Sequence, residues 1–415
     1  MPKYGYDYLM NQLRRKLPRV RLRYGYYDQK HRSDDFGIST PPDLRYLRVK
    51  VGWATTAVDA LANRLRVRSI SDSQYKVSDL FAKNNPDIIF RSAFISALIG
   101  SCAFAYIYRD DAGEVRIQII DAANATGTID PVTYLLTEGV AVLDRFADGS
   151  PKQTAYFEDY KTTYYTVDEK DRVLDEVVVE HPVARPLLVP IIYRPDASRP
   201  FGRSRISRAG MDYIDEAART LKRSEISAEF YSFPQRWVTG LEQDFDQLDK
   251  WRASMSAMMQ FEKDNEGDSP KLGQFTQQSM DPHVNQLRMI ASMFAGETGL
   301  TLDDLGFVSD NPSSSEAIKA AHETLRSQAR SAQSDFTTAL INIAYTGICY
   351  QDGVNYERST FKDVSVKWEP VFEPDLAAIS NIGDAIVKIN TAIPQAVGRS
   401  FVRDLTGIEL TEEAN

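Results

Sequence analysis

The sequence predicts an α+β protein, and three observations support that class. Short segments with the two-residue alternation of strands gather between Cys102 and Tyr193. Turn-forming stretches, such as Asp110-Asp111-Ala112-Gly113, separate them. Long segments with apolar residues in steps of three and four come after them, as in amphipathic helices. A run of strands followed by a run of long helices is typical of α+β folds.

The first hundred residues are expected to be mainly helical. Leu9, Leu13 and Leu17 predict an amphipathic helix over residues 6–17, which Pro18 should end. A second helix is expected over residues 42–65, and further helical pattern covers residues 79–80 and 87–99. An antiparallel sheet should follow, with strands at residues 103–109, 114–120, 132–146, 152–158, 162–167, 173–180 and 190–193.

The second half is expected to be built around three helices. They should cover residues 204–231, 282–297 and about 313–350, and the last opens with Ser313 and Glu316 in the spacing of a capping box. No Gly or Pro interrupts that last helix before Gly347, so a single rod of roughly 50 Å is predicted. Its apolar and small residues form one helical stripe, which we expect to be buried: Ile318, Ala321, Leu325, Ala329, Ala332, Phe336, Leu340, Ile343 and Gly347. The remaining predicted elements are a strand at Trp237, a helix over 243–260, a returning strand at 271–275, a strand at 364–368 and a helical tail over 375–410.

Composition is that of an ordinary globular chain, with 415 residues of which 43% are hydrophobic. No apolar run approaches the roughly 20 residues that a membrane span needs, and the N-terminus lacks the apolar core of a secretion signal. We therefore expect the chain to fold in the cytosol without a membrane partner. Cys102 and Cys349 are expected to be buried free thiols, with a disulfide between them as the alternative.

Charge is unevenly distributed behind the net value of −9. Basic residues outnumber acids in residues 1–70, with a dense cluster from Arg14 to Arg23, whereas acids dominate between Glu242 and Asp268. Opposite charge in separate blocks favours contacts between neighbouring copies or with partners. The alternative interpretation is that both blocks are solvated faces.

Motifs for catalysis, cofactors and metals are missing from the sequence. It has no phosphate-binding loop, no dinucleotide-binding glycine motif, no nucleophile elbow, and no His or Cys pair at metal-ligand spacing. We expect no catalytic residue, no cofactor and no metal. One alternative is a nucleic-acid-processing enzyme in which Asp110 and Asp111 hold a metal, although Ala112-Gly113 explains both aspartates as turn formers.

Arginines mark the start of the helix predicted over 204–231. Arg203, Arg205 and Arg208 could contact phosphates, or could pair with an acidic neighbour in an oligomer. No motif that reads bases accompanies them, so any contact with nucleic acid should be independent of sequence.

The order of the predicted parts, together with several short motifs, resembles the portal proteins of tailed bacteriophages, particularly the SPP-type siphophage family. The motifs are Pro200-Phe201-Gly202-Arg203-Ser204-Arg205-Ile206, Phe233-Pro234-Gln235-Arg236, the stretch Gly299–Gly306, and Asn311–Ala317. The resemblance covers about residues 40–400. It implies a portal-like fold with an α/β wing, long stem helices, a small α/β clip and a helical crown. The implied boundaries are 1–203 (wing), 204–231 (stem), 232–280 (clip), 281–298 (stem), 299–314 (tunnel loop), 315–374 (wing) and 375–415 (crown).

What the resemblance implies is a homo-oligomeric ring, a dodecamer, at one vertex of the capsid in the virion. Double-stranded DNA would pass through it without sequence specificity during packaging and ejection. Its implied partners are the terminase large subunit, a head-completion adaptor, and the major capsid and scaffolding proteins, with assembly in the host cytoplasm. An oligomeric adaptor without DNA passage is the third alternative.

Site residues follow from the same resemblance. The DNA-facing tunnel loop would present Asp303, Asp304, Asp310 and Ser313, and it contains no Lys or Arg. The clip would bind partners through Trp237, Glu242, Asp244, Asp246, Trp251, Asp264 and Glu266. Arg203, Arg205 and Arg208 are the candidates for contacts between subunits.

Overall fold

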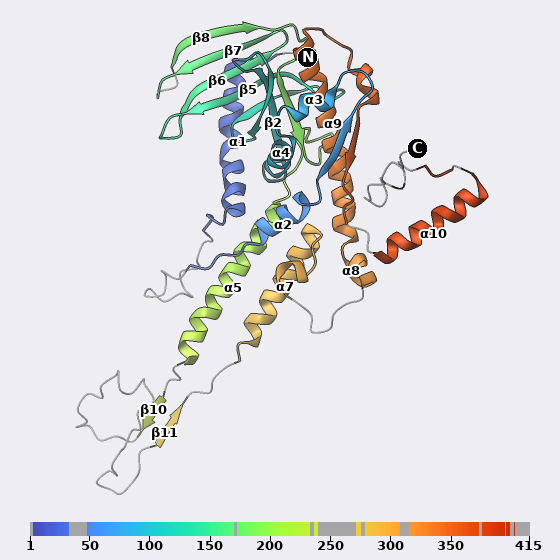
Figure 1. The fold of residues 1–415 in the computed structure, drawn as a ribbon. Helices are drawn as coiled ribbons and strands as arrows, with labels where there is room; N and C mark the ends of the chain where they lie inside the picture. Colours follow the sequence, from blue (N-terminus) through green and yellow to red (C-terminus); the bar gives the residue numbers. More distant parts are fainter. Residues whose placement is uncertain are drawn as a thin grey trace, which may run out of the picture.

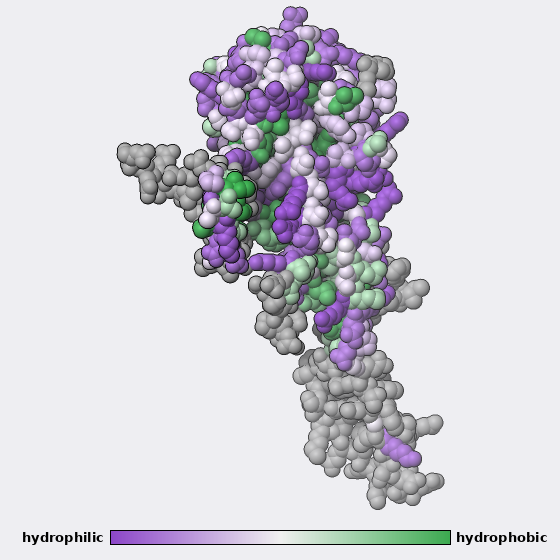
Figure 2. All heavy atoms as spheres, turned by 90° about the vertical axis from the view of Figure 1, so that its right-hand side faces the viewer, coloured by the Kyte–Doolittle hydropathy of each residue, from purple (hydrophilic) through white to green (hydrophobic). Residues whose placement is uncertain are grey.

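The computed structural model describes residues 3–32, 48–169, 172–232, 236–239, 271–274, 279–307, 315–372, 376–394, 396–398 and 402. It is a mixed helix-and-sheet fold. In Figure 1 the sheets and several helices form a body from which helices α5 (Arg208–Ser232) and α7 (Asp281–Thr298) extend side by side. A two-stranded hairpin, β10 (Arg236–Thr239) and β11 (Lys271–Gln274), lies at the far end of that extension. Figure 2 shows the body and the start of the extension in a view turned by 90°.

Two antiparallel sheets form the body. The smaller has the order β3-β2-β9 and the larger β4-β5-β6-β7-β8. The strands are β2 (Cys102–Arg109), β3 (Val115–Asp121), β4 (Ala125–Ile129), β5 (Leu136–Arg145), β6 (Pro151–Glu158), β7 (Lys161–Val167), β8 (Val173–Glu180) and β9 (Leu188–Ile192). The predicted hairpin of β2 and β3 is confirmed, and the other predicted strands of this region are present to within a few residues.

Two strands were not predicted. β4 lies between the strands predicted at residues 114–120 and 132–146. The turn that follows it is built by Asp130, which accepts hydrogen bonds from the backbone of Val132 and the hydroxyl of Thr133. β1 (Val67–Ser71) pairs antiparallel with β12 (Ser365–Trp368), nearly 300 residues away in sequence. A pairing between such distant segments leaves no local signal, since each strand completes its two-stranded sheet only in the folded chain.

Helix α1 (Tyr6–Tyr27) continues through Pro18, so the predicted end at that proline was wrong. Proline removes one backbone donor, at a cost of about 3 kcal/mol in a helix interior. Packing on both sides of it offsets that cost: Leu9 and Leu13 are buried against β5 and β6, and Val20 joins the main core. Helix α2 (Trp53–Ala62) is shorter than predicted, because residues 48–52 are not helical.

The core centres on helix α4 (Pro86–Gly100), which packs on β2 and against α2 and α1. Helix α3 (Val77–Ala82) precedes it. On the other side, helix α9 (Glu323–Asp352) buries the stripe that the sequence predicted, and Phe336 stacks on Phe94 of α4 with ring centroids 4.6 Å apart. The stripe residues Leu325, Ala329, Ala332, Phe336, Leu340 and Ile343 are each at most 2% exposed.

The single long rod predicted from residue 313 is two helices. α8 (Ser315–Ala321) and α9 are separated at His322, whose φ of −93° and ψ of 8° leave the helical region. The His322 ring stacks on Phe372, and its Nδ1 lies 3.8 Å from a carboxylate oxygen of Asp304. These tertiary contacts lie at the break, where the sequence contains no Gly or Pro. As a result Ile318, predicted on the buried stripe, is 47% exposed.

The C-terminal part contains the short helix η3 (Arg358–Asp363) and the longer helix α10 (Leu376–Ala392), which lies beside the body in Figure 1. Within the described ranges, no helix is both long and apolar enough to cross a membrane. Cys102 and Cys349 are buried free thiols, and burial raises the pKa of Cys102 to about 11. The thiol interpretation is confirmed.

Candidate functional surfaces

The described part of the predicted tunnel loop is anchored to the body. Gly299 ends α7 with a φ of +72°, and a Cβ there would lie 2.9 Å from side-chain atoms of Gln328 and Thr324. The next residue, Leu300, is buried in the core. Glycine is therefore required here both by its backbone conformation and by the space available.

The two aspartates of this loop differ in their surroundings. They belong to the short helix η2 (Asp303–Leu305). Asp303 is exposed, whereas the Asp304 carboxylate accepts hydrogen bonds from the backbone N–H and the hydroxyl of Thr301, both at 2.9 Å. Asp304 therefore caps the turn as well as carrying charge. Asp310 and Ser313 lie outside the described residues, and the assignment of all four to a DNA-facing loop stays a prediction.

Most residues of the predicted clip surface lie outside the described residues, namely Glu242, Asp244, Asp246, Trp251, Asp264 and Glu266. Trp237 is in β10, where it pairs with Gly273 of β11, so the two predicted strands of this region are confirmed. The predicted helix over 243–260 is also outside the described part of the chain.

The arginines predicted at the start of the stem helix are not in one environment. Helix α5 begins only at Arg208, because the preceding residues bond to the end of α4: the Ser204 hydroxyl donates to Ile99 O at 2.7 Å and the Arg205 N–H to Leu98 O at 2.8 Å. Arg203 is exposed and forms an ion pair with Asp196 at 2.6 Å.

Arg205 was predicted to face a neighbouring subunit, and it lies instead inside the chain with 7% of its surface exposed. Its guanidinium donates to the backbone oxygens of Ala57 and Thr298 and to the side-chain oxygen of Gln328. These acceptors belong to α2, α7 and α9. Arg205 therefore holds three helices together, and its assignment to a contact between subunits is corrected.

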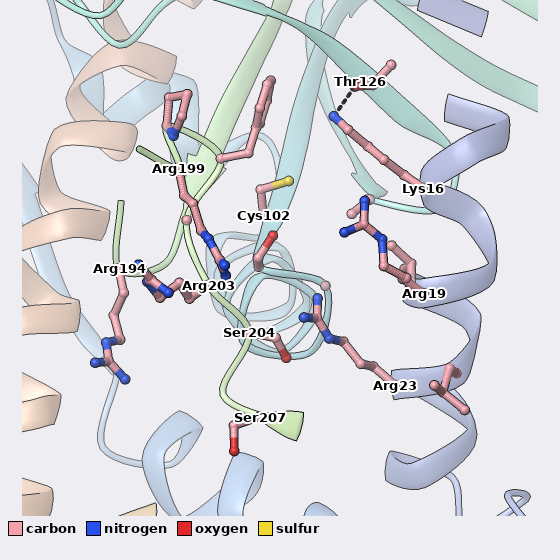
Figure 3. A pocket seen from close by; sticks show the side chains of 18 of the residues that line it. Lys16, Arg19, Arg23, Cys102, Thr126, Arg194, Arg199, Arg203, Ser204 and Ser207 are labelled. Carbon is pink, nitrogen blue, oxygen red and sulfur yellow. Dashed lines mark hydrogen bonds between the residues drawn. The ribbon is translucent and has the colours of Figure 1, made fainter. Parts of the chain in front are cut away.

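A basic cleft of about 800 Å³ opens between α1 and the segment 194–208. Figure 3 shows Lys16, Arg19 and Arg23 entering it from α1 and Arg199 entering it from the opposite wall, whose lining also includes Arg203. The two arginine clusters are separate in the sequence. The segment between them contains helices α2, α3 and α4 and both sheets of the body, so only the fold brings the clusters together.

The hairpin tip with Asp110 and Asp111 is explained as a turn. The Asp110 carboxylate accepts hydrogen bonds from the backbone N–H groups of Ala112 and Glu114 and from Arg116, which holds the pKa of Asp110 below its ordinary value. Among the residues that the structure describes, no group of three or more His, Cys, Asp or Glu side chains is arranged to hold a metal ion.

Strand β8 is an edge strand and all eight of its residues are exposed. Five of them are large and apolar, with exposed fractions between 41% and 68%: Val173, Leu174, Val177, Val178 and Val179. An alternating strand of a stable domain normally buries one face. A long apolar edge strand left open is a surface that normally requires cover.

Comparison with known families decides the class of the protein. A family model described as phage portal protein, SPP1 Gp6-like, matches residues 6–402. The chain belongs to this family. The resemblance stated from the motifs and their order is thereby confirmed.

Two curated relatives carry the name portal protein. That of Mycobacterium phage L5 is 26% identical over 320 residues, covering 72% of this chain and 65% of the relative. That of Mycobacterium phage D29 is 24% identical over 343 residues, covering 78% of this chain and 70% of the relative. The chain thus matches about two thirds of the length of these relatives.

Solved structures give a weaker likeness. Chains from the neck of a native GTA particle computed with C12 symmetry and of an empty GTA particle computed with C6 symmetry give TM-scores of 0.46 and 0.42. Their identities are 14% and 12%, and each comparison covers 87% of this chain and 90% of the other. Likeness at this level carries no argument about function.

Proposed function

We propose that copies of this chain close into a ring, a dodecamer, that forms the channel for double-stranded DNA at one capsid vertex of the virion. The observation that carries the proposal is the match of the portal family model to residues 6–402. DNA would enter through this ring during packaging and leave through it at ejection. The protein would act as a structural conduit assembled in the host cytoplasm, without catalysis.

The arrangement of elements supports the assignment of different roles to different parts of each subunit. The body, with residues 1–203 and 315–374, would be the wing, and α5 and α7 would be the stem that extends from it (Figure 1). The hairpin β10–β11 at the end of the stem would belong to the clip, and α10 to the crown. Two paired helices carrying a small hairpin make an extended spoke rather than an enclosed pocket.

Partners would divide along the same parts. The clip, acidic in sequence between Glu242 and Asp268, would dock the terminase large subunit and later the head-completion adaptor. The wing would contact the major capsid and scaffolding proteins. Because the chain matches only about two thirds of its relatives' length, each of these interactions is a proposal.

Passage of DNA requires a wall that does not hold phosphate groups tightly. Every Lys or Arg that binds a phosphate releases a condensed counterion, and the affinity gained in this way would slow sliding. The tunnel loop is acidic, and Asp303 is its exposed carboxylate among the described residues 299–307. We therefore assign Asp303 to the wall that faces the DNA.

The substitution Asp303→Lys tests this assignment. It changes the charge by two units in every subunit, and we expect the yield of packaged genomes to fall at least about tenfold while rings still assemble. Asp303 is preferable to Asp304, because Asp304 also caps the Thr301 turn. The measurements are the amount of nuclease-protected DNA per particle and the appearance of rings in electron micrographs.

Asp111→Lys is the matched control, since Asp111 is exposed at a hairpin tip of the body and undergoes the same change of charge. Normal packaging is expected with it. Normal packaging with Asp303→Lys would contradict the assignment of the loop, and loss of packaging with Asp111→Lys alone would instead support the enzyme that uses Asp110 and Asp111.

A further inference from the structure

The basic cleft is an open cavity between α1 and the segment 194–208. Its volume of about 800 Å³ is in the range of sites that bind ligands or peptide segments. Cations from α1, from the 194–203 segment and from the first turn of α5 line it, together with the apolar side chains of Val20, Phe201 and Met211. Among the described residues, Glu297 is the one acidic side chain in the lining.

Part of the positive charge in the cleft is compensated inside the chain. Lys16 donates to Thr126 at 2.8 Å and lies over the Phe201 ring, and Arg203 is paired with Asp196. For Arg19, Arg23, Arg199 and Arg208 no carboxylate lies within 4.0 Å in the part of the chain that the structure describes. Four guanidinium groups therefore share one concavity without an ion-pair partner within 4.0 Å in the described part of the chain, and Glu297 is the one acidic side chain of the lining.

The pKa of Arg23 is shifted in the direction that this crowding of positive charge favours. Burial, and then the guanidinium groups of Arg19, Arg208 and Arg199, lower the pKa of Arg23. The rest of the molecule has the opposite character, since the whole chain carries a net charge of −9. An anionic occupant would relieve the repulsion, and its binding would be strongest where the walls exclude water.

Strand β8 has the complementary composition. It carries Asp175, Glu176 and Glu180 and no Lys or Arg. Its apolar residues are exposed on both faces, and its outer edge has no strand beside it in the described structure. A segment that is both acidic and apolar matches the cleft, whose lining is both basic and apolar. A nucleic-acid backbone would match only the basic part of the lining, and it would leave the valines of β8 uncovered.

The two surfaces are also different surfaces of one chain, as a ring requires. A closed ring of identical copies is held by a heterologous contact, in which one patch of each copy meets another patch of the next. β8 belongs to the edge of the five-stranded sheet, away from the cleft lining.

We propose that the acidic edge strand β8 of one subunit docks in the basic cleft of the adjacent subunit. The inference rests on the proposed ring and identifies the contact that closes it. Asp175 and Glu176 pair with the arginines of the cleft, and the valines of β8 are covered by the neighbouring subunit.

Charge reversal tests the contact in three variants of the full chain. Arg19→Glu with Arg23→Glu reverses the cleft, Asp175→Lys with Glu176→Lys reverses the strand, and the third variant combines all four. Each reversal alone places like charges opposite each other, so we expect the concentration at which rings dissociate to rise at least about tenfold. The combined variant should recover rings, because every subunit supplies both surfaces. Native mass spectrometry and negative-stain images give the readout.

Arg15→Glu with Arg21→Glu is the matched control, with the same change of charge on exposed residues of α1 that do not line the cleft. It should leave ring formation unchanged, and thermal melting should show that all variants are folded. The proposal is overturned if reversed clefts still form rings as the unmodified protein does, or if the combined variant fails to recover them. Rings that persist but lose affinity for a DNA duplex would identify the cleft as a phosphate site instead. If the unmodified protein itself forms no ring, the proposed function fails before this contact is tested.

Discussion

Arg205→Met is expected to destabilise the folded chain by roughly 3–5 kcal/mol, since it removes three hydrogen bonds from a buried guanidinium at the junction of α2, α7 and α9. A hydrogen bond made by a charged group contributes about 1.5–3 kcal/mol. The methionine retains much of the packing volume. The loss therefore reports on hydrogen bonding rather than on a cavity.

The measurement for Arg205 is the midpoint of urea unfolding at fixed protein concentration, because assembly would otherwise add to the apparent stability. The unfolding midpoint of Arg205→Lys should lie between those of the unmodified protein and Arg205→Met, since an ammonium group is a point charge that cannot match the fork of a guanidinium. Arg203→Met is the matched control two residues away. It removes only an exposed ion pair with Asp196, worth at most about 1 kcal/mol. A change within about 1 kcal/mol for Arg205→Met would show that the three acceptors are satisfied without it.

Glu138→Gln should have the second largest effect, a loss of roughly 2–4 kcal/mol. Glu138 is fully buried in β5, and its carboxylate accepts hydrogen bonds from the backbone of Tyr4 and Gly5 and from the hydroxyls of Thr128 and Tyr156. The four donors lie at 2.8–3.0 Å. Glutamine keeps the shape but turns an NH₂ group toward donors. The N-terminus of α1 would lose its attachment to the sheet.

The pH dependence of Glu138 has a definite sign. Burial alone would raise the pKa of Glu138, but the four donors together outweigh it and hold the pKa below its ordinary value. When the pH falls below the ordinary pKa of a glutamate, the unfolded chain binds a proton at Glu138 more readily than the folded chain does. The contribution of Glu138 to the free energy of unfolding is therefore complete above that pKa and is lost as the pH falls. The stability gap between unmodified protein and Glu138→Gln should narrow from about pH 6 to about pH 3. A gap that widens toward acid would contradict the assigned hydrogen bonds.

The local structure could be predicted from the sequence wherever the residue pattern of a segment agreed with its burial in the fold. The stripe from Leu325 to Ile343 predicted the buried face of α9, and Asp110 with Gly113 predicted the β2–β3 turn. It was insufficient where distant contacts decide the local conformation. Pro18 stays inside α1 because packing on both sides of it holds the helix, and His322 breaks the long rod where its ring meets Phe372.

For the candidate surfaces too, local features could be predicted from the sequence and features that depend on distant contacts could not. The acidic character of the loop at Asp303 is visible in sequence, because a charge pattern is local. The interior position of Arg205 is not visible, since it depends on acceptors from α2, α7 and α9 that only the fold brings together. The basic cleft likewise needs Arg23 and Arg199 to meet across the sheet. The openness of β8 could not be predicted either, because a strand of an antiparallel sheet with apolar residues on both faces is normally covered on at least one of them.

The mass of the purified protein in solution is the decisive test of the proposed ring. We expect a closed particle of twelve chains, twelve times the 46.8 kDa mass of one subunit, with a central opening in electron micrographs. A protein that remains a single 46.8 kDa chain at every concentration, and is missing from the capsid vertex of assembled particles, would contradict it.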